Sequence, residues 1–278
     1  MAVSDLTDHR HRDAQAGRVG EVSDPGQPAA IAESTPSACT LLADPFLALA
    51  ADMLDDLEKV RIANENRLRQ LTRSETDSDG EERGFGLDEA HPDVARFAAL
   101  VHMQAQLEHQ ATLNLARMMR HHPLGPWMKS RKGIGDKQGA RLLAAIGDPY
   151  WNTLHNRPRT VSELRSYCGW GDAAKQRRQR GQKSNWSETA RKRTWLIAAK
   201  CIMFADSPYR AVYDATRARY AEATHQHPCI RCGPKNHPAE PGTPLSDGHK
   251  HARALRAVAK EILRDLWREA RRIHLEQP

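Results

Sequence analysis

The sequence lacks long apolar runs and contains few aromatic side chains. No apolar run approaches the roughly 18 residues that a membrane-spanning helix needs, so we expect no membrane contact. The N-terminus shows no basic region followed by an apolar one, which predicts no secretory signal and a cytoplasmic location. Aromatic residues make up 5% of the chain and hydrophobic residues 39%. This balance favours a helical protein with a thin core over a β-sandwich.

Cysteine is also scarce, and its number is odd. Cys39, Cys168 and Cys201 stand alone, whereas Cys229 and Cys232 form a CxxC pair. An odd number of cysteines in a cytosolic chain argues against a framework of disulfides. We expect Cys168 and Cys201 to be buried as small apolar side chains.

Basic residues exceed acidic ones. The chain of 278 residues has 42 Lys and Arg against 35 Asp and Glu, which gives a net charge of +7. A basic surplus favours polyanionic partners, and its concentration in one segment strengthens that interpretation.

The chain divides into three predicted parts. Residues 1–43 are rich in Ala, Ser, Asp, Pro and Gly without periodicity, which predicts a disordered tail. Residues 44–123 predict a long antiparallel helical hairpin, or coiled coil, and residues 124–278 predict a second helical domain. The break between them is the Pro- and Gly-bearing segment 121–127. The predicted fold class is therefore all-α.

Two long helices are expected in the hairpin. Asp44 and Pro45 are a typical cap and first helical residue, and a second helix is predicted from Pro92. Arg61 and Asn64 interrupt the apolar seam of the first helix, which either sets the register of the pair or loosens it. The seam contains Leu47, Ala50, Leu54, Leu57, Leu68 and Leu71. The matching face of the second helix is predicted to contain Phe97, Leu100, Leu107, Ala111 and Met118. Such a hairpin also predicts homo-oligomers.

The segment 129–148 predicts a helix-hairpin-helix element that binds DNA. Gly133 and Gly135 allow backbone angles that a Cβ would forbid and let a phosphate approach closely, while Ile134 fills the space between the two helices. Amide groups at the start of the second helix would then point at the anion. Lys132 and Lys137 add positive charge. A plain tight turn between helices is the alternative interpretation.

A strongly basic segment follows. Between residues 175 and 193 the only acid is Glu188, and the first part of the segment predicts a loop. Its cations are Lys175, Arg177, Arg178, Arg180, Lys183, Arg191, Lys192 and Arg193. Such a loop next to the hairpin predicts contacts to the nucleic-acid backbone that weaken with salt. The alternative is a solvated charged loop.

The CxxC pair predicts a zinc knuckle within an insertion at residues 225–251. CxxC spacing lets Cys229 and Cys232 reach one metal ion, and two histidines would complete a tetrahedral structural zinc site. The candidate partners are His225, His227, His237, His249 and His251; the preferred set adds His249 and His251, with His237 as the main rival. A flexible insertion with two free thiols is the alternative.

A family resemblance joins these pieces. The segment 132–170, with "KGIG", "AAIGD" and Leu164, Tyr167 and Gly169, resembles the C-terminal domain of the bridge-RNA-guided insertion-sequence transposases, whose N-terminal domain is RuvC-like with four metal-binding acidic residues (DEDD). Residues 44–122 are similar to the coiled-coil segment that mediates assembly in that family. The resemblance covers about 230 residues, and implies DNA and structured RNA as partners.

The chain departs from the family pattern in two ways. Residues 1–43 offer no RuvC-like domain, and the loop "WGDAAKQRRQRGQK" lacks the nucleophilic serine that the family carries there; Ser184 and Ser187 lie later, and Ser187 fits a helix cap. Three hypotheses follow. The chain is a DNA-binding relative of these transposases without catalysis of its own, an active transposase that uses Ser184 or Ser187 with a separate acidic domain, or an assembly protein built on the hairpin.

Overall fold

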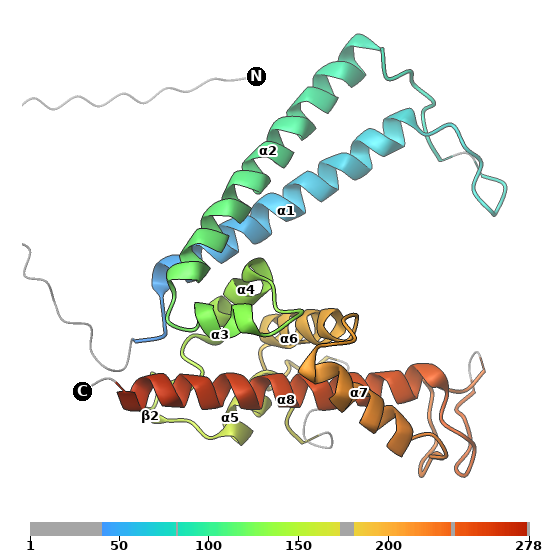
Figure 1. Cartoon of the computed structure of the whole chain (residues 1–278). Helices are drawn as coiled ribbons and strands as arrows, with labels where there is room; N and C mark the ends of the chain where they lie inside the picture. The colour runs from blue at the N-terminus through green and yellow to red at the C-terminus, as the bar shows by residue number, and fades with distance from the viewer. Residues whose placement is uncertain (1–40, 82, 173–180, 235–236, 277–278) are drawn as a thin grey trace, which may run out of the picture. The chain divides into compact units, whose positions relative to one another are not determined.

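The computed structural model describes residues 41–81, 83–172, 181–234 and 237–276. These residues form eight α-helices and one two-stranded antiparallel sheet, which confirms the all-α prediction (Figure 1). The elements are α1 (Pro45–Thr72), α2 (Pro92–His121), α3 (Gly125–Ser130), α4 (Asp136–Ile146), β1 (Trp151–Asn152), β2 (Arg157–Pro158), α5 (Val161–Tyr167), α6 (Glu188–Cys201), α7 (Pro208–Arg219) and α8 (Asp247–Glu276).

Both long helices begin where their capping signals predict. The Asp44 carboxylate accepts hydrogen bonds from the amides of Phe46 and Leu47, and Pro45 is the first residue of α1. Pro92 likewise opens α2, which packs along α1. Since proline lacks the amide that a first helical residue leaves unbonded, it fits both positions without loss.

The polar residues in the seam are matched across the two helices. Arg61 Nε donates to Glu108 at 2.5 Å, and Asn64 donates to Gln104 at 3.0 Å. Of the two interpretations of these residues, the structure therefore favours a defined register. The predicted face of α2 is wrong in part, because Leu100 and Leu107 are exposed. The buried residues of α2 are Val94, Val101, Ala111, Leu115 and Met119.

Helix α8 supplies much of the core. Its buried stripe includes Leu255, Val258, Ile262 and Leu266, and α5, α6 and α7 pack beside it (Figure 1). Cys168 and Cys201 are buried, as predicted from their isolation. Leu42, Leu47, Leu115 and Met119 belong to the same buried cluster as the residues of α4, α6 and α8.

A network of ion pairs joins α1 to α4 and α6. Arg141 on α4 has a side chain only 2% exposed and lies between Asp55 at 2.8 Å and Glu58 at 2.7 Å. Arg193 on α6 also pairs with Asp55, and Lys137 pairs with Glu58 at 2.9 Å. Because Arg141 is almost fully desolvated, both carboxylates are needed to offset the cost of burying its charge.

Between α7 and α8 the chain forms a loop with little regular structure. Two isolated antiparallel bridges, Thr224 with Pro244 and Cys229 with Ala239, fold this loop back on itself. None of the helices in the described part of the chain combines the length and the apolar character needed to cross a membrane.

Candidate metal centre and nucleic-acid interface

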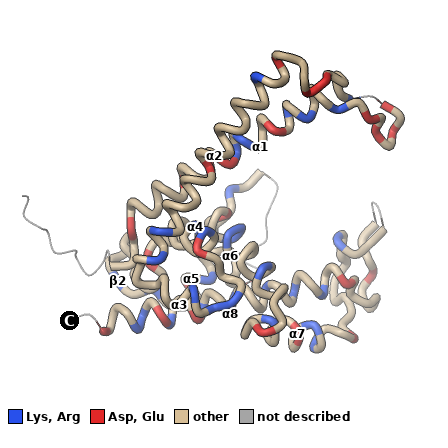
Figure 2. Tube along the Cα trace, turned by 45° about the horizontal axis from the view of Figure 1, so that its top comes forward, with Lys and Arg blue, Asp and Glu red and all other residues tan. Residues whose placement is uncertain are grey.

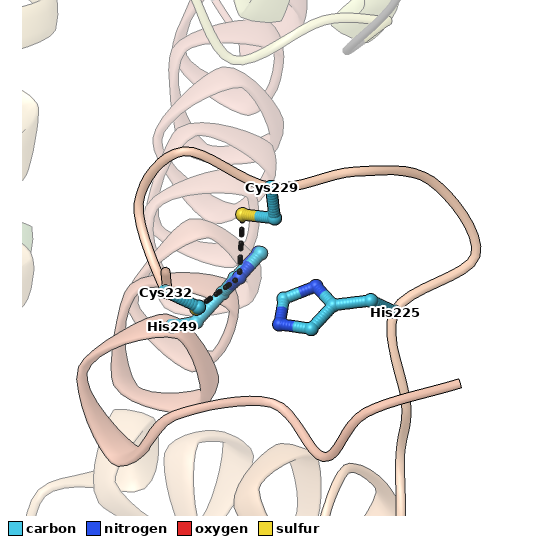
Figure 3. Close-up of side chains that lie close together, drawn as sticks. All are labelled: His225, Cys229, Cys232 and His249. Atoms are coloured by element: carbon cyan, nitrogen blue, oxygen red, sulfur yellow. Dashed lines mark hydrogen bonds between the residues drawn. The ribbon is translucent and has the colours of Figure 1, made fainter. Parts of the chain in front are cut away.

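Four metal-binding side chains converge in the loop between α7 and α8. His225, Cys229, Cys232 and His249 each offer a ligand atom, and these atoms all lie within 4.8 Å of one another. Figure 3 shows the two thiols and the two imidazole rings pointing toward a common space. Two thiolates and two imidazoles are a typical ligand set for a tetrahedral metal site.

The distances within the cluster suit a bound ion. His249 Nδ1 lies 3.3 Å from the sulfur of Cys232 and 3.8 Å from that of Cys229 (Figure 3). In a tetrahedron with metal–sulfur bonds of about 2.3 Å and metal–nitrogen bonds of about 2.0 Å, ligand atoms lie roughly 3.3 to 3.8 Å apart. His249 and the two cysteines therefore already stand at the separations that coordination requires, and His225 completes a set whose ligand atoms lie within 4.8 Å of one another.

The environment of the histidines favours metal binding. His225 is buried, and its Nε2 has no hydrogen-bond partner among the described residues. A buried ring nitrogen without a partner is costly unless something else binds it, and a metal ion would do so. Burial lowers the pKa of His249, and the nearby Arg253 and His225 lower it further. The imidazole is thereby kept in the neutral form that coordinates metals.

The environment of Cys232 favours its thiolate. Its pKa lies below the usual value for a thiol: desolvation acts to raise it, but hydrogen bonding with Ser246 and Cys229 and the charge of Arg231 outweigh that effect. The hydroxyl of Ser246 lies 3.0 Å from the sulfur. Since the thiolate is the form that binds metal, this environment prepares Cys232 as a ligand.

Local backbone structure holds the two cysteines in place. The amides of Cys232 and Gly233 both donate to the carbonyl of Cys229, which closes the turn of the CxxC pair. A Cβ at Gly233 would lie 1.9 Å from the carbonyl oxygen of His237, so only glycine fits there. The bridge between Cys229 and Ala239 then fixes the far side of the loop.

The predicted ligand set differs from the observed cluster at one position. The structure brings His225 to the cluster in place of His251, whose Nδ1 lies 2.7 Å from the hydroxyl of Tyr213. The reason is helical geometry: α8 begins at Asp247, so residues 249 and 251 lie about 200° apart around its axis. The rival His237 is also outside the cluster.

A second site of interest is the turn between α3 and α4. Gly133 has φ +100°, and an added Cβ would lie 2.5 Å from Cα of Cys201 on α6. Ile134 is buried in the core, as predicted. Gly135 is the N-cap of α4, with φ −85° and ψ 152°; no side chain caps the helix there, and the space around an added Cβ is open. The two glycines therefore serve different purposes.

The turn borders an open groove of about 520 Å³ between α4 and α6. Its lining residues are Gly133, Ile134, Gly135, Gln138, Leu196, Ile197, Lys200 and Phe204. The ammonium groups of Lys132 and Lys200 lie 5.8 and 5.6 Å from the ring centre of Phe204, so two cations meet at one end of this groove. Lys200 was not among the predicted cations, because 65 residues separate it from Gly135.

The predicted DNA-binding cations fall into three groups. Lys137 and Arg193 form ion pairs with acids of the hairpin, and Lys132 pairs with Asp206 at an exposed position. Lys183 and Lys192 are exposed, and Arg191 lies over the rings of two tryptophans. The remaining four lie outside the described residues: Lys175, Arg177, Arg178 and Arg180.

The two candidate serine nucleophiles have local structural partners. Ser187 is the N-cap of α6, where its hydroxyl accepts a hydrogen bond from the amide of Ala190 at 3.2 Å. The hydroxyl of Ser184 has two acceptors for its single proton, the carbonyl of Trp186 and the carboxylate of Glu188, both at 3.3 Å. Among the described residues, no histidine or lysine is paired with either hydroxyl as its general base.

Comparison with known proteins yields no family. No protein-family model matches the chain, and no curated protein is significantly similar to it. The functional assignment therefore depends on the geometry of the metal centre and of the groove.

Proposed function

We propose that the protein binds the phosphate backbone of nucleic acid, with DNA as the expected ligand, at the groove beside the turn between α3 and α4. The observation that carries the proposal is the open N-terminus of α4 at Gly135, which no side chain caps. Free amides and the helix dipole at such an end attract an anion. A phosphate seated there would contact backbone amides and leave the bases unread.

The charges around the groove support this ligand. Lys132 and Lys200 stand at one end of it, and the acid nearest the amides, Asp136, has Arg120 as a partner at 3.7 Å. Lys132 pairs with Asp206 at a position where both side chains are more than half exposed. Exposed pairs of this kind are weak, so a phosphate can replace Asp206 as the partner of Lys132.

The decisive variant is Gly135→Asp. The extended backbone at residue 135 is the conformation of an N-cap, so an aspartate there would bond to the free amides and stabilise α4 by roughly a few tenths of a kcal/mol relative to glycine. The same carboxylate would occupy and repel the phosphate site. We expect a higher melting temperature together with lost binding to a fluorescent DNA duplex.

One control and one further test variant complete this experiment. Lys59→Gln removes an exposed cation of the hairpin, and should leave binding unchanged. Lys200→Gln should weaken binding and lower the slope of log affinity against log salt by about 1. If Gly135→Asp binds duplex DNA and structured RNA as tightly as the wild-type chain does, the groove is not the site.

We propose further that the ion held by His225, Cys229, Cys232 and His249 is zinc. A complete set of four protein ligands leaves no open coordination position, which is typical of structural rather than catalytic zinc. The loop has few apolar residues to bury, so the metal would supply the stability that a core cannot.

A specific surface favours a second candidate function, assembly through the hairpin. Four apolar side chains of α1 that are each at least half exposed repeat at heptad spacing: Phe46, Leu49, Met53 and Val60. This stripe lies beside the one that packs on α2, and heptad stripes of this kind are typical of helices that pair with another chain. We propose that a second copy of the chain covers it.

The resemblance to insertion-sequence transposases extends the proposal to a biological setting. We propose a DNA-binding relative of that group that lacks strand cleavage of its own or depends on a partner for it. The partners of Ser184 and Ser187 support this choice over an active serine recombinase, because Ser187 is used as a helix cap. A transposition assay with and without a separate RuvC-like protein would test it.

A further inference from the structure

Three guanidinium groups beside α8 bond to backbone carbonyls instead of carboxylates. Arg165 on α5 donates twice to the carbonyl of Lys260, at 3.1 and 3.0 Å. Arg256 on α8 and Arg191 on α6 donate to carbonyls of the segment 169–171, each at 2.5 Å. A carbonyl satisfies one or two of the five donors of a guanidinium but does not neutralise its charge.

Together with Lys260 these residues form what we name the α5–α8 basic cluster: Arg165, Arg191, Arg256 and Lys260. Among the described residues, none of the four has a carboxylate within 4.0 Å. Asp172 acts on Arg256 and Lys260 from farther away, and Glu188 acts on Arg191. The cluster therefore holds more positive charge than its surroundings neutralise.

These cations also repel one another. Burial lowers the pKa of Lys260, and Arg256 and Arg165 lower it further. The pKa of Arg256 is lowered by burial first and then by Arg191. Such repulsion works against the folded state, and a bound anion would relieve it.

The cluster continues along one side of α8, where Arg256, Lys260 and Arg264 are partly buried and Arg268 is exposed. Arg256, Lys260, Arg264 and Arg268 follow one another at intervals of four residues, about 6 Å per step and about 18 Å in all. Lys and Arg positions recur along this helix in Figure 2. Arg264 pairs with Glu261 and Arg268 pairs with Asp265. Arg256 and Lys260 have no such ion pair among the described residues. Like charges at the spacing of Arg256 and Lys260 destabilise a helix.

We propose that the α5–α8 basic cluster is a second binding surface for the phosphate backbone of nucleic acid. The inference rests on the proposed function and adds a second contact to it. Helix α6 connects the two surfaces, since Arg191 lies in its first turn and Lys200 in its last, about 14 Å along the axis. Measured along the axis of duplex DNA, 18 Å corresponds to about five phosphates of one strand.

The apolar face of α8 argues for nucleic acid over a membrane surface. A helix that lies on a bilayer inserts apolar side chains from the face opposite its charges. In α8 that face is already buried in the core, including Val258, Ile262 and Leu266. The cluster is therefore charged but has no exposed apolar face on α8 that could insert into a bilayer.

The test uses the full chain and a fluorescent DNA duplex over a series of salt concentrations. The variant Arg256→Gln with Lys260→Gln removes two cluster charges and keeps amide donors at both positions. We expect roughly ten-fold weaker binding at low salt and a salt slope smaller by about 2. The matched control, Arg67→Gln with Arg69→Gln, removes two charges at exposed positions of α1 and should keep the wild-type slope. Lys260→Gln alone, with an expected slope change of about 1, replaces the double variant if that does not fold.

The outcomes separate this inference from the proposed function. If the cluster variants bind like wild type while Gly135→Asp loses binding, the cluster is overturned and the groove stands. If cluster and control variants lose affinity equally, only net charge matters and the cluster is again overturned. Sedimentation with phosphatidylserine vesicles provides the last arm: lost vesicle binding with unchanged DNA binding would assign the surface to lipid and overturn the proposal.

Discussion

Gly133 lies against Cys201, and the contact leaves no room for a side chain. A Cβ at residue 133 would stand 2.5 Å from the Cα and 2.9 Å from the sulfur of Cys201. The turn between α3 and α4 is therefore packed onto the C-terminal end of α6. This packing brings Lys200 of α6 to the same groove as Gly135. Gly133 permits the close packing that forms the groove, and Gly135 leaves the N-terminus of α4 uncapped beside it.

The two glycines should respond oppositely to substitution. Gly133→Ala places a Cβ against Cys201 and forces alanine to φ +100°, so we expect a loss of about 1–3 kcal/mol in the free energy of unfolding. Gly135→Asp should raise that free energy through capping. Urea unfolding of both variants measures the difference. Equal stability of the two variants would contradict this division of roles.

Acid should weaken the attachment of α1 to α4 through Glu58. Burial acts to raise the pKa of Glu58, but hydrogen bonds and charges from Arg141 and Lys137 outweigh it and lower the pKa to about 2. Because the folded pKa lies below the unfolded value of 4.5, this carboxylate stabilises the protein above that pH. Its contribution is lost as the pH falls from 4.5 to about 2.

The comparison with Glu58→Gln isolates this effect. The variant should be less stable than the wild-type chain at pH 5, and the difference in urea midpoint should shrink as the pH approaches 2. The other carboxyl groups titrate in both proteins, so their contributions cancel in the difference between the two urea midpoints. A difference that stays constant over this range would show that Glu58 is not the titrating group.

Much of the fold could be predicted because its signals are local. The starts of the two long helices were predicted from Asp44 with Pro45 and from Pro92, and the start of α6 was predicted from Ser187. Each signal needs only a few neighbouring residues, since a cap bonds to amides two or three positions away. The faces of the helices were harder to predict. On α2 the heptad pattern includes Leu100 and Leu107, yet both are exposed.

The pairing of distant charges could not be predicted from the sequence. Arg141 meets Asp55 and Glu58 across more than 80 residues, and no local pattern links these positions. The metal centre could be predicted in part. Its CxxC pair was evident, but the choice of histidines depended on where α8 begins. Ser246, which accepts a hydrogen bond from the amide of His249, was the available signal that α8 begins before His249.

Ser187 should prove to be a structural residue. Ser187→Ala removes the cap of α6 and should cost about 1 kcal/mol of stability, whereas Ser187→Asp keeps an acceptor for the amide of Ala190 and should restore it. Aspartate lacks a hydroxyl nucleophile. If strand exchange is detected in the wild-type chain and disappears in a stably folded Ser187→Asp, a catalytic role replaces the structural one.

Assembly should depend on the exposed stripe of α1. Leu49→Glu with Met53→Glu places two charges in that stripe, and we expect a smaller molar mass by light scattering than for the wild-type chain. The matched control is Leu154→Glu, which introduces a charge at a position outside the hairpin where the leucine is 86% exposed. A wild-type chain that is monomeric at all concentrations would contradict the proposed dimer surface.

Metal content should separate the two histidines of α8. The purified chain is expected to contain one zinc ion, and His249→Ala should lose it because it removes a ligand that stands 3.3 Å from Cys232. His251→Ala should retain the ion, since that ring contacts Tyr213 instead. His225→Ala tests the candidate histidine that was left out of the preferred set, and should behave like His249→Ala. Mass spectrometry under native conditions reads out all three variants. Zinc retained by His225→Ala and lost from His251→Ala would restore the ligand set predicted from the sequence, and would mean that α8 begins later than residue 249 in the metal-bound protein.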